Sequence, residues 1–246
     1  MPSGWLCLAW CMRLTVHELP RLCALGLAAC TASALLMQAA HAQTSPSAAP
    51  FPDCLYSFYQ GPQLVAVAPC NDDLANLGAK PDVIAAMRFF GIPEGTVVFK
   101  SCPGGIFSAR PRRGTPGQYE ILYPSDVSTG YIAPIVHELA HVVQIMAAGS
   151  LQALEPNKHH RRIELGADFL AGLAFNQALK HLSNVDFEAN LMLVGSYKQG
   201  DKNHGAPEHR TQAFRLGAFR APPLRELNIR QALEYFNANE YARVTR

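Results

Sequence analysis

Two histidines and a glutamate near the middle of the chain have the spacing of a metal-binding motif. They form the H-E-x-x-H sequence His137-Glu138-Leu-Ala-His141, inside an otherwise apolar run from 131 to 148. On a helix, His137, His141 and Gln144 share one stripe, and Glu138 lies next to it. A helix that is apolar all round is normally buried, and buried polar groups need partners. A metal ion would supply one, so the pattern predicts that both imidazoles bind one Zn²⁺ and that Glu138 takes a proton from a zinc-activated water.

The alternative is a chance match of the motif on an ordinary surface helix. Such a helix would carry further Lys, Arg or Glu side chains on its polar face, and this run carries none. The composition of the run therefore favours metal binding.

A catalytic zinc site usually has three protein ligands and keeps one position open. Glu164, 23 residues after His141, begins a second predicted helix and is the expected third ligand. Asp168, one turn later, can accept the free ring N–H of a zinc-bound histidine, which fixes the tautomer. The alternative for Glu164 is a surface carboxylate at a helix N-terminus. His159 and His160, in the basic loop before this helix, are the other candidates for the third ligand.

Three blocks of this sequence follow one another between about residues 123 and 220. They are His137-Glu-Leu-Ala-His-Val-Val-Gln144, Glu164-Leu-Gly-Ala-Asp168-Phe-Leu-Ala-Gly172, and His204-Gly-Ala-Pro-Glu-His-Arg210 with Phe214 and Gly217. Together and in this order they resemble the neutral zinc metallopeptidases of bacteria, which are of the gluzincin type, with H-E-x-x-H followed by E-x-x-x-D.

The resemblance implies a role for each matching residue. His137, His141 and Glu164 would bind zinc, Glu138 would be the catalytic acid and base, and Asp168 would hold a ligand histidine.

The third block has a physical interpretation of its own. Peptide hydrolysis creates an oxyanion, which a second donor beside the metal commonly stabilises. His204 is the first choice for that catalytic donor and Tyr197 the second, and the alternative is a His204 that caps a helix or lies in solvent. Arg210 is expected to pack or to pair with a carboxylate.

The N-terminal residues 1–42 have the pattern of a cleaved signal peptide. An apolar stretch over 22–40 follows Arg13 and Arg21, and Ala40-His41-Ala42 is an A-x-A cleavage site. A single spanning helix and lipid attachment at Cys30 are less favoured alternatives. We therefore expect an exported protein, periplasmic or secreted, without a stable membrane span after signal removal.

Composition and cysteine content narrow the class of protein and its expected partners. The chain has 246 residues, 49% of them hydrophobic, and a net charge of +2, which implies no nucleic-acid partner. Cys54, Cys70 and Cys102 remain after signal removal, and an exported chain is expected to form one disulfide among them, with the pairing left open.

The order of the predicted elements indicates an α+β, zincin-like single domain over 54–246, after a flexible linker at 43–53. A helix at 81–90 and strands at 96–100, 106–110 and 118–123 lead into the histidine helix. Another strand is expected at 64–68, a helix start at Asn71-Asp-Asp73, and helices at 162–181, 188–197, 208–219 and 227–237. A small antiparallel sheet is expected to pack on the active-site helix, where its edge strand could bind an extended peptide.

Together these features predict an exported zinc metallopeptidase that hydrolyses peptide bonds in a peptide or protein substrate. Two alternatives remain: a non-catalytic zinc-stabilised binding module, and a zinc hydrolase that acts on cell-wall peptides.

Overall fold

The computed structural model describes residues 70–103, 107–126, 131–154, 160–193, 205–219 and 227–246. All of them belong to one compact unit, Pro50–Arg246. The predicted signal peptide, the linker, Cys54 and the strand expected at 64–68 lie outside the described residues. Within the described ranges, no helix is long and apolar enough to cross a membrane.

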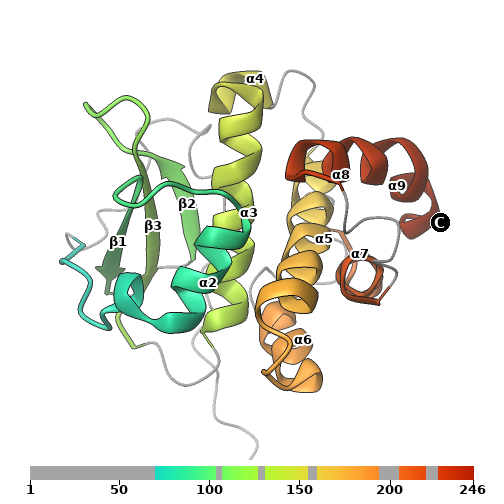
Figure 1. Cartoon of the computed structure of the whole chain (residues 1–246), viewed down its shortest axis with the longest axis horizontal. Helices are drawn as coiled ribbons and strands as arrows, with labels where there is room; N and C mark the ends of the chain where they lie inside the picture. The colour runs from blue at the N-terminus through green and yellow to red at the C-terminus, as the bar shows by residue number, and fades with distance from the viewer. Residues whose placement is uncertain (1–69, 104–106, 127–130, 155–159, 194–204, 220–226) are drawn as a thin grey trace, which may run out of the picture. The chain divides into compact units, whose positions relative to one another are not determined.

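The described chain is a mixed α+β structure in which helices accompany a small three-stranded sheet (Figure 1). The elements are, in chain order, η2 (Leu77–Ala79), α2 (Pro81–Phe89), β1 (Val97–Cys102), β2 (Ser108–Pro111), β3 (Tyr119–Pro124), α3 (Ile132–Ala148), α4 (Leu151–Leu154), α5 (His160–Ala178), α6 (Asn184–Leu193), α7 (Pro207–Phe219), α8 (Ile229–Tyr235), the π-helix η3 (Phe236–Glu240) and α9 (Tyr241–Val244).

The sheet is mixed, so the prediction of an antiparallel sheet was wrong for one pair of strands. The strand order is β1-β3-β2, with β3 antiparallel to β2 and parallel to β1. The Arg- and Gly-rich turn between β2 and β3 closes a hairpin, in which the Arg112 N–H donates to the Gln118 carbonyl at 2.8 Å. Because β2 lies beyond β3 rather than between β1 and β3, the first and third strands, which run in the same direction, become neighbours and pair in parallel. Strand β2 is therefore an edge of the described sheet.

Helix α3 lies between the sheet and helix α5 and contacts both (Figure 1). It is buried from Ala133 to Ile145, as its apolar composition predicted. Gly149 ends the helix with a φ of 83°, a left-handed backbone conformation that residues other than glycine rarely adopt.

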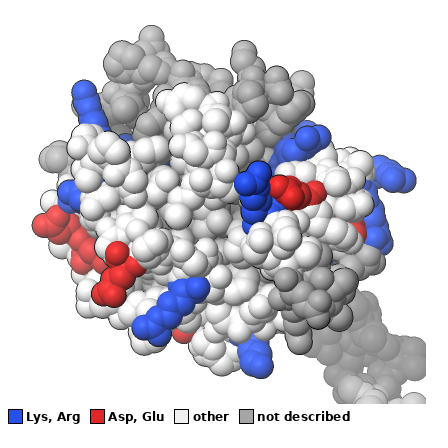
Figure 2. All heavy atoms as spheres, turned by 45° about the horizontal axis from the view of Figure 1, so that its top comes forward, with Lys and Arg blue, Asp and Glu red and all other residues white. Residues whose placement is uncertain are grey.

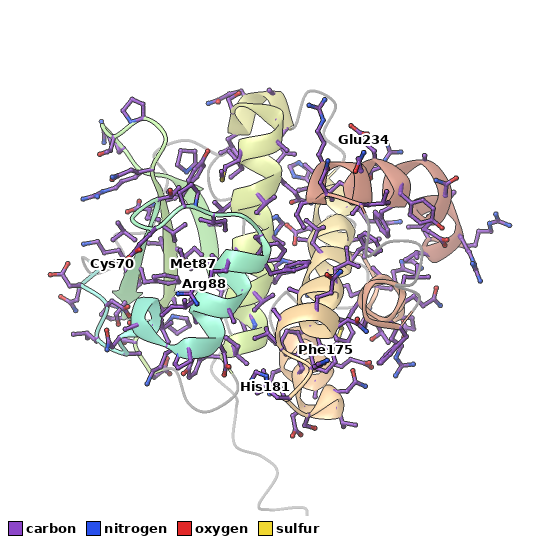
Figure 3. All side chains as sticks on the ribbon, in the orientation of Figure 1. Cys70, Met87, Arg88, Phe175, His181 and Glu234 are labelled. Carbon is purple, nitrogen blue, oxygen red and sulfur yellow. A yellow bond between two sulfur atoms is a disulfide. The ribbon has the colours of Figure 1, made fainter. Side chains whose placement is uncertain are left out.

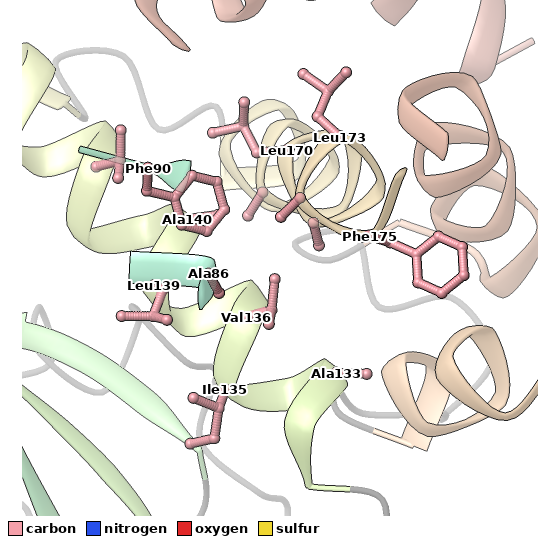
Figure 4. Close-up of a cluster of buried hydrophobic side chains, with 14 of the residues drawn as sticks. Ala86, Phe90, Ala133, Ile135, Val136, Leu139, Ala140, Leu170, Leu173 and Phe175 are labelled. Atoms are coloured by element: carbon pink, nitrogen blue, oxygen red, sulfur yellow. The ribbon is translucent and has the colours of Figure 1, made fainter. Parts of the chain in front are cut away.

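The hydrophobic core joins α2, α3 and α5 (Figure 4). In that close-up, Ala86 and Phe90 from the end of α2 lie near Val136 and Ala140 of α3 and Leu170 of α5. All five side chains are buried. Helix α3 is thus held by apolar contacts on the side that faces α2 and α5.

Helices α5 and α7 pack closely because both carry glycine at the contact. A Cβ at Gly172 would overlap the Phe214 carbonyl oxygen, and one at Gly217 would overlap the Phe169 carbonyl oxygen. Glycine at both positions therefore lets the two helix backbones approach each other.

The segment before α2 differs from the prediction. Asp73 caps no helix at Leu74; its carboxylate accepts the Gly78 N–H at 2.8 Å and the Tyr123 hydroxyl at 2.7 Å. A disulfide joins Cys70, labelled beside the sheet in Figure 3, to Cys102 at the end of β1. The predicted disulfide is therefore confirmed, and its pairing is Cys70–Cys102.

Candidate metal centre

Three predicted ligand atoms converge between α3 and α5. The Nε2 atoms of His137 and His141 are 3.0 Å apart, and Glu164 Oε2 lies 3.2 Å from the first and 3.5 Å from the second. All three residues are buried. They form the only group of this kind within the described ranges, and it could hold a metal ion. The arrangement follows from local structure, because i, i+4 spacing places the two imidazoles one turn apart on the same face of α3, and the facing turn of α5 presents Glu164.

His137 is held from its other ring nitrogen by a buried ion pair. Its Nδ1 lies 2.9 Å from Asp168 Oδ1. Arg210 of α7 donates to both oxygens of the same carboxylate, from Nε and Nη2, at 2.8 Å each. A carboxylate held by a guanidinium is an acceptor only, so a neutral His137 would place its proton on Nδ1, the ring nitrogen that faces Asp168. In this neutral form, the Nε2 atom of His137 turns its lone pair toward the other two ligand atoms.

His141 is held in the same way by an amide. Its Nδ1 lies 2.9 Å from Gln144 Oε1, and Gln144 Nε2 donates to the Ile163 carbonyl at 2.9 Å. A carbonyl can only accept, which fixes the orientation of the Gln144 amide. Its oxygen faces His141, so Nδ1 of His141 donates and Nε2 has the lone pair.

The donor set fits a divalent metal ion. Two imidazole nitrogens and one carboxylate oxygen meet at Nε2, Nε2 and Oε2, and all three atoms are acceptors when both histidines are neutral. The lone pairs of these three acceptor atoms repel one another at such short distances unless a proton or a cation lies between them. Ligands bound to zinc at about 2.0–2.1 Å in a tetrahedron are about 3.3 Å apart, close to the separations of 3.0, 3.2 and 3.5 Å found here.

In the metal-free protein, a second proton on His137 provides the positive charge that offsets this repulsion. Burial is the largest single influence on the pKa of His137 and lowers it, but Asp168 and Glu164 together raise that pKa from 6.5 to about 9. Burial also raises the pKa of Asp168, but Arg210 and then His137 outweigh it and hold that pKa below its usual value. The site is therefore built to bind positive charge.

Glu138 lies in the middle of the same helix and is fully buried. At 3.6 residues per turn it is about 60° around the α3 axis from His141. Its carboxylate is thus carried by the rigid helix that carries both histidines, as the motif predicted.

The structure describes only some of the other residues predicted to belong to the site. His204 and Tyr197, the predicted oxyanion donors, lie outside the described residues, as does His159. His160 is the first residue of α5 and is not a member of the metal-capable group. Arg210 pairs with a carboxylate, as predicted.

The role of Gln144 and the pairing of Arg210 with Asp168 were not predicted from the sequence. The position of Gln144 on the histidine stripe was the available signal for the first. For the second, nothing short of the tertiary structure could have paired residues 42 positions apart.

No family model, curated protein or solved structure matches this chain. What the residues themselves define is an α+β protein with a buried group of two histidines and a glutamate that could bind a metal ion.

Proposed function

We propose that this protein is an exported zinc-dependent metallopeptidase of the gluzincin type, similar to the neutral zinc metallopeptidases. The observation that carries the proposal is the convergence of His137 Nε2, His141 Nε2 and Glu164 Oε2 within 3.5 Å of one another. The H-E-x-x-H motif places a carboxylate beside these ligands, which a purely structural metal site does not require.

Each residue has a defined task in this proposal. His137, His141 and Glu164 would hold the zinc, and Asp168 would fix the tautomer of His137. When bound, zinc lowers the pKa of a water molecule and polarises the scissile carbonyl. Glu138 accepts the proton of the attacking water and delivers it to the leaving amine. His204 remains the proposed donor to the oxyanion.

The sheet supports a zincin-like architecture with a peptide substrate. Strand β2 is one of the two edge strands of the described sheet, and it contacts α3, the helix that carries the ligands. An extended peptide that paired with such an edge would run along the histidine helix. This is the support for a peptide or protein substrate.

Surface charge and the disulfide support the remaining parts of the proposal. On the face in Figure 2, Lys and Arg side chains lie singly or beside Asp and Glu, which favours partners other than nucleic acid. The Cys70–Cys102 disulfide favours an oxidising compartment, in keeping with export to the periplasm or medium.

A structural zinc site in a binding module is the second candidate function. The burial of all three ligands and of Glu138 favours it, because a structural site is closed to water. A zinc hydrolase that acts on cell-wall peptides would use the same residues as the peptidase. The peptidase would cleave proteins, the cell-wall hydrolase would cleave peptidoglycan peptides, and the binding module would cleave neither.

The test is a comparison of the wild-type protein with Glu138→Gln. Both are expected to bind one zinc ion, and only the wild type is expected to cleave casein, with activity lost in chelator. Cleavage of peptidoglycan peptides alone would move the assignment to a cell-wall hydrolase. Full proteolysis by the zinc-loaded variant would refute the role of Glu138, and zinc binding without cleavage of either substrate would support the binding module.

A further inference from the structure

We propose that Gln144 is a positioning residue of the metal centre, which sets the tautomer of His141 and the register of the two ligand-bearing helices. The inference rests on the metal site of the proposed function, but it does not depend on the reaction that the site catalyses.

Gln144 makes two side-chain hydrogen bonds. Its amide joins two elements: Oε1 accepts from His141 Nδ1 at 2.9 Å, and Nε2 donates to the Ile163 carbonyl at 2.9 Å. Gln144 is nearly fully buried, with 4% of its surface exposed, so water does not readily replace these bonds. A rotated amide would direct its NH₂ group at an N–H and its oxygen at a carbonyl, and would lose both bonds.

Ile163, whose carbonyl accepts one of these bonds, immediately precedes Glu164 on α5. The hydrogen bond from α3 to the Ile163 carbonyl therefore fixes the backbone next to the third ligand. Gln144 holds the imidazole of His141 at one end and the turn that carries Glu164 at the other. His137 needs no such help, because Asp168 and Arg210 hold its ring.

The packing around Gly166 is an observation independent of these hydrogen bonds. A Cβ at Gly166 would lie 2.9 Å from Gln144 Nε2, closer than real Cβ contacts. Glycine at this position therefore leaves room for the amide to reach the Ile163 carbonyl. Since Gly166 binds no metal in this proposal, its substitution perturbs Gln144 without removing a ligand.

The functional consequence follows from the tautomer. With Nδ1 of His141 donating to an amide oxygen, Nε2 is available to a metal and its basicity is raised. Without Gln144, the metal-free ring can place its proton on Nε2 and turn away. Loss of such a partner typically weakens metal binding about 10- to 100-fold.

The experiment measures zinc affinity by competition with a chromophoric chelator, and unfolding by urea, for four variants of the full-length protein. Gln144→Met and Gly166→Ala are expected to bind zinc about 10- to 100-fold more weakly than the wild type. Gln144→Glu keeps an oxygen acceptor for His141 Nδ1 but loses the donor to the Ile163 carbonyl, so it is expected to bind zinc more tightly than Gln144→Met and more weakly than the wild type. Val143→Ala is the matched control, since it removes buried apolar atoms from the neighbouring position on α3 and should lower stability without a change in affinity.

A second readout is the imidazole tautomer, observed by nitrogen-15 NMR. His141 of the zinc-loaded wild type is expected to be protonated at Nδ1 and metal-bound at Nε2. Wild-type zinc affinity in folded Gln144→Met, or a His141 proton on Nε2, would overturn the inference and leave the proposed function standing. A wild type that binds no zinc would overturn both.

Discussion

The pair Asp168–Arg210 gives the sharpest stability prediction, because both partners are buried and joined by two hydrogen bonds. Arg210 is 4% exposed and Asp168 is fully buried, and their bonds are 2.8 Å long. Arg210→Met would leave the Asp168 carboxylate in the interior with only His137 as a charge partner. Breaking a buried pair on one side typically costs about 3–5 kcal/mol. That is a large share of the 5–15 kcal/mol by which domains are usually stable.

The assay is urea unfolding of the metal-free protein, with a matched control and a double variant. Arg215→Met is the control, because Arg215 makes the same two-bond contact to Glu188 at 2.8–2.9 Å on the surface, where the loss is expected to be much smaller. Asp168→Asn/Arg210→Met removes both charges and is expected to be less destabilised than the sum of the two single variants. Equal losses for Arg210→Met and Arg215→Met, or an additive double variant, would refute this reasoning.

Two further predictions concern the free energy of unfolding. The pKa of His137 is raised from 6.5 to about 9 in the folded state, so its contribution of about 3 kcal/mol is fully present below pH 6.5 and is lost as the pH rises through 9. Urea unfolding in chelator should show this decline in the wild type and not in His137→Gln, and a wild-type stability constant from pH 6 to 10 would contradict it. The Cys70–Cys102 disulfide closes a sequence separation of 32, and its loss in Cys70→Ala/Cys102→Ala should cost about 3–4 kcal/mol of unfolding free energy. A thermal midpoint unchanged by the double substitution or by reductant would exclude that contribution.

The sequence was informative about the ligands because their chemistry is encoded locally. Helical spacing fixes the stripe of His137 and His141, and the absence of Lys and Arg and of any acidic residue besides Glu138 on that helix signals burial. Glu164 and Asp168 are one turn apart on a second helix, so they too could be predicted before their distances to α3 were known.

What the sequence did not reveal depends on contacts between distant segments. The parallel pairing of β1 with β3 results from the placement of β2 at the far edge, which residue alternation does not specify. The partner of Arg210 and the pairing of Cys70 with Cys102 are likewise set by tertiary packing. Gln144 lay on the predicted stripe, but its role required the position of the Ile163 carbonyl on the facing helix.

A crystal structure of the zinc-loaded protein, with the metal located by anomalous scattering, would test the proposed metal centre most directly. One zinc ion is expected about 2.0–2.2 Å from His137 Nε2, His141 Nε2 and a carboxylate oxygen of Glu164. No protein side chain is expected at the fourth position. A zinc ion bound elsewhere, or a fourth protein ligand that closes the site, would contradict the proposed catalytic centre.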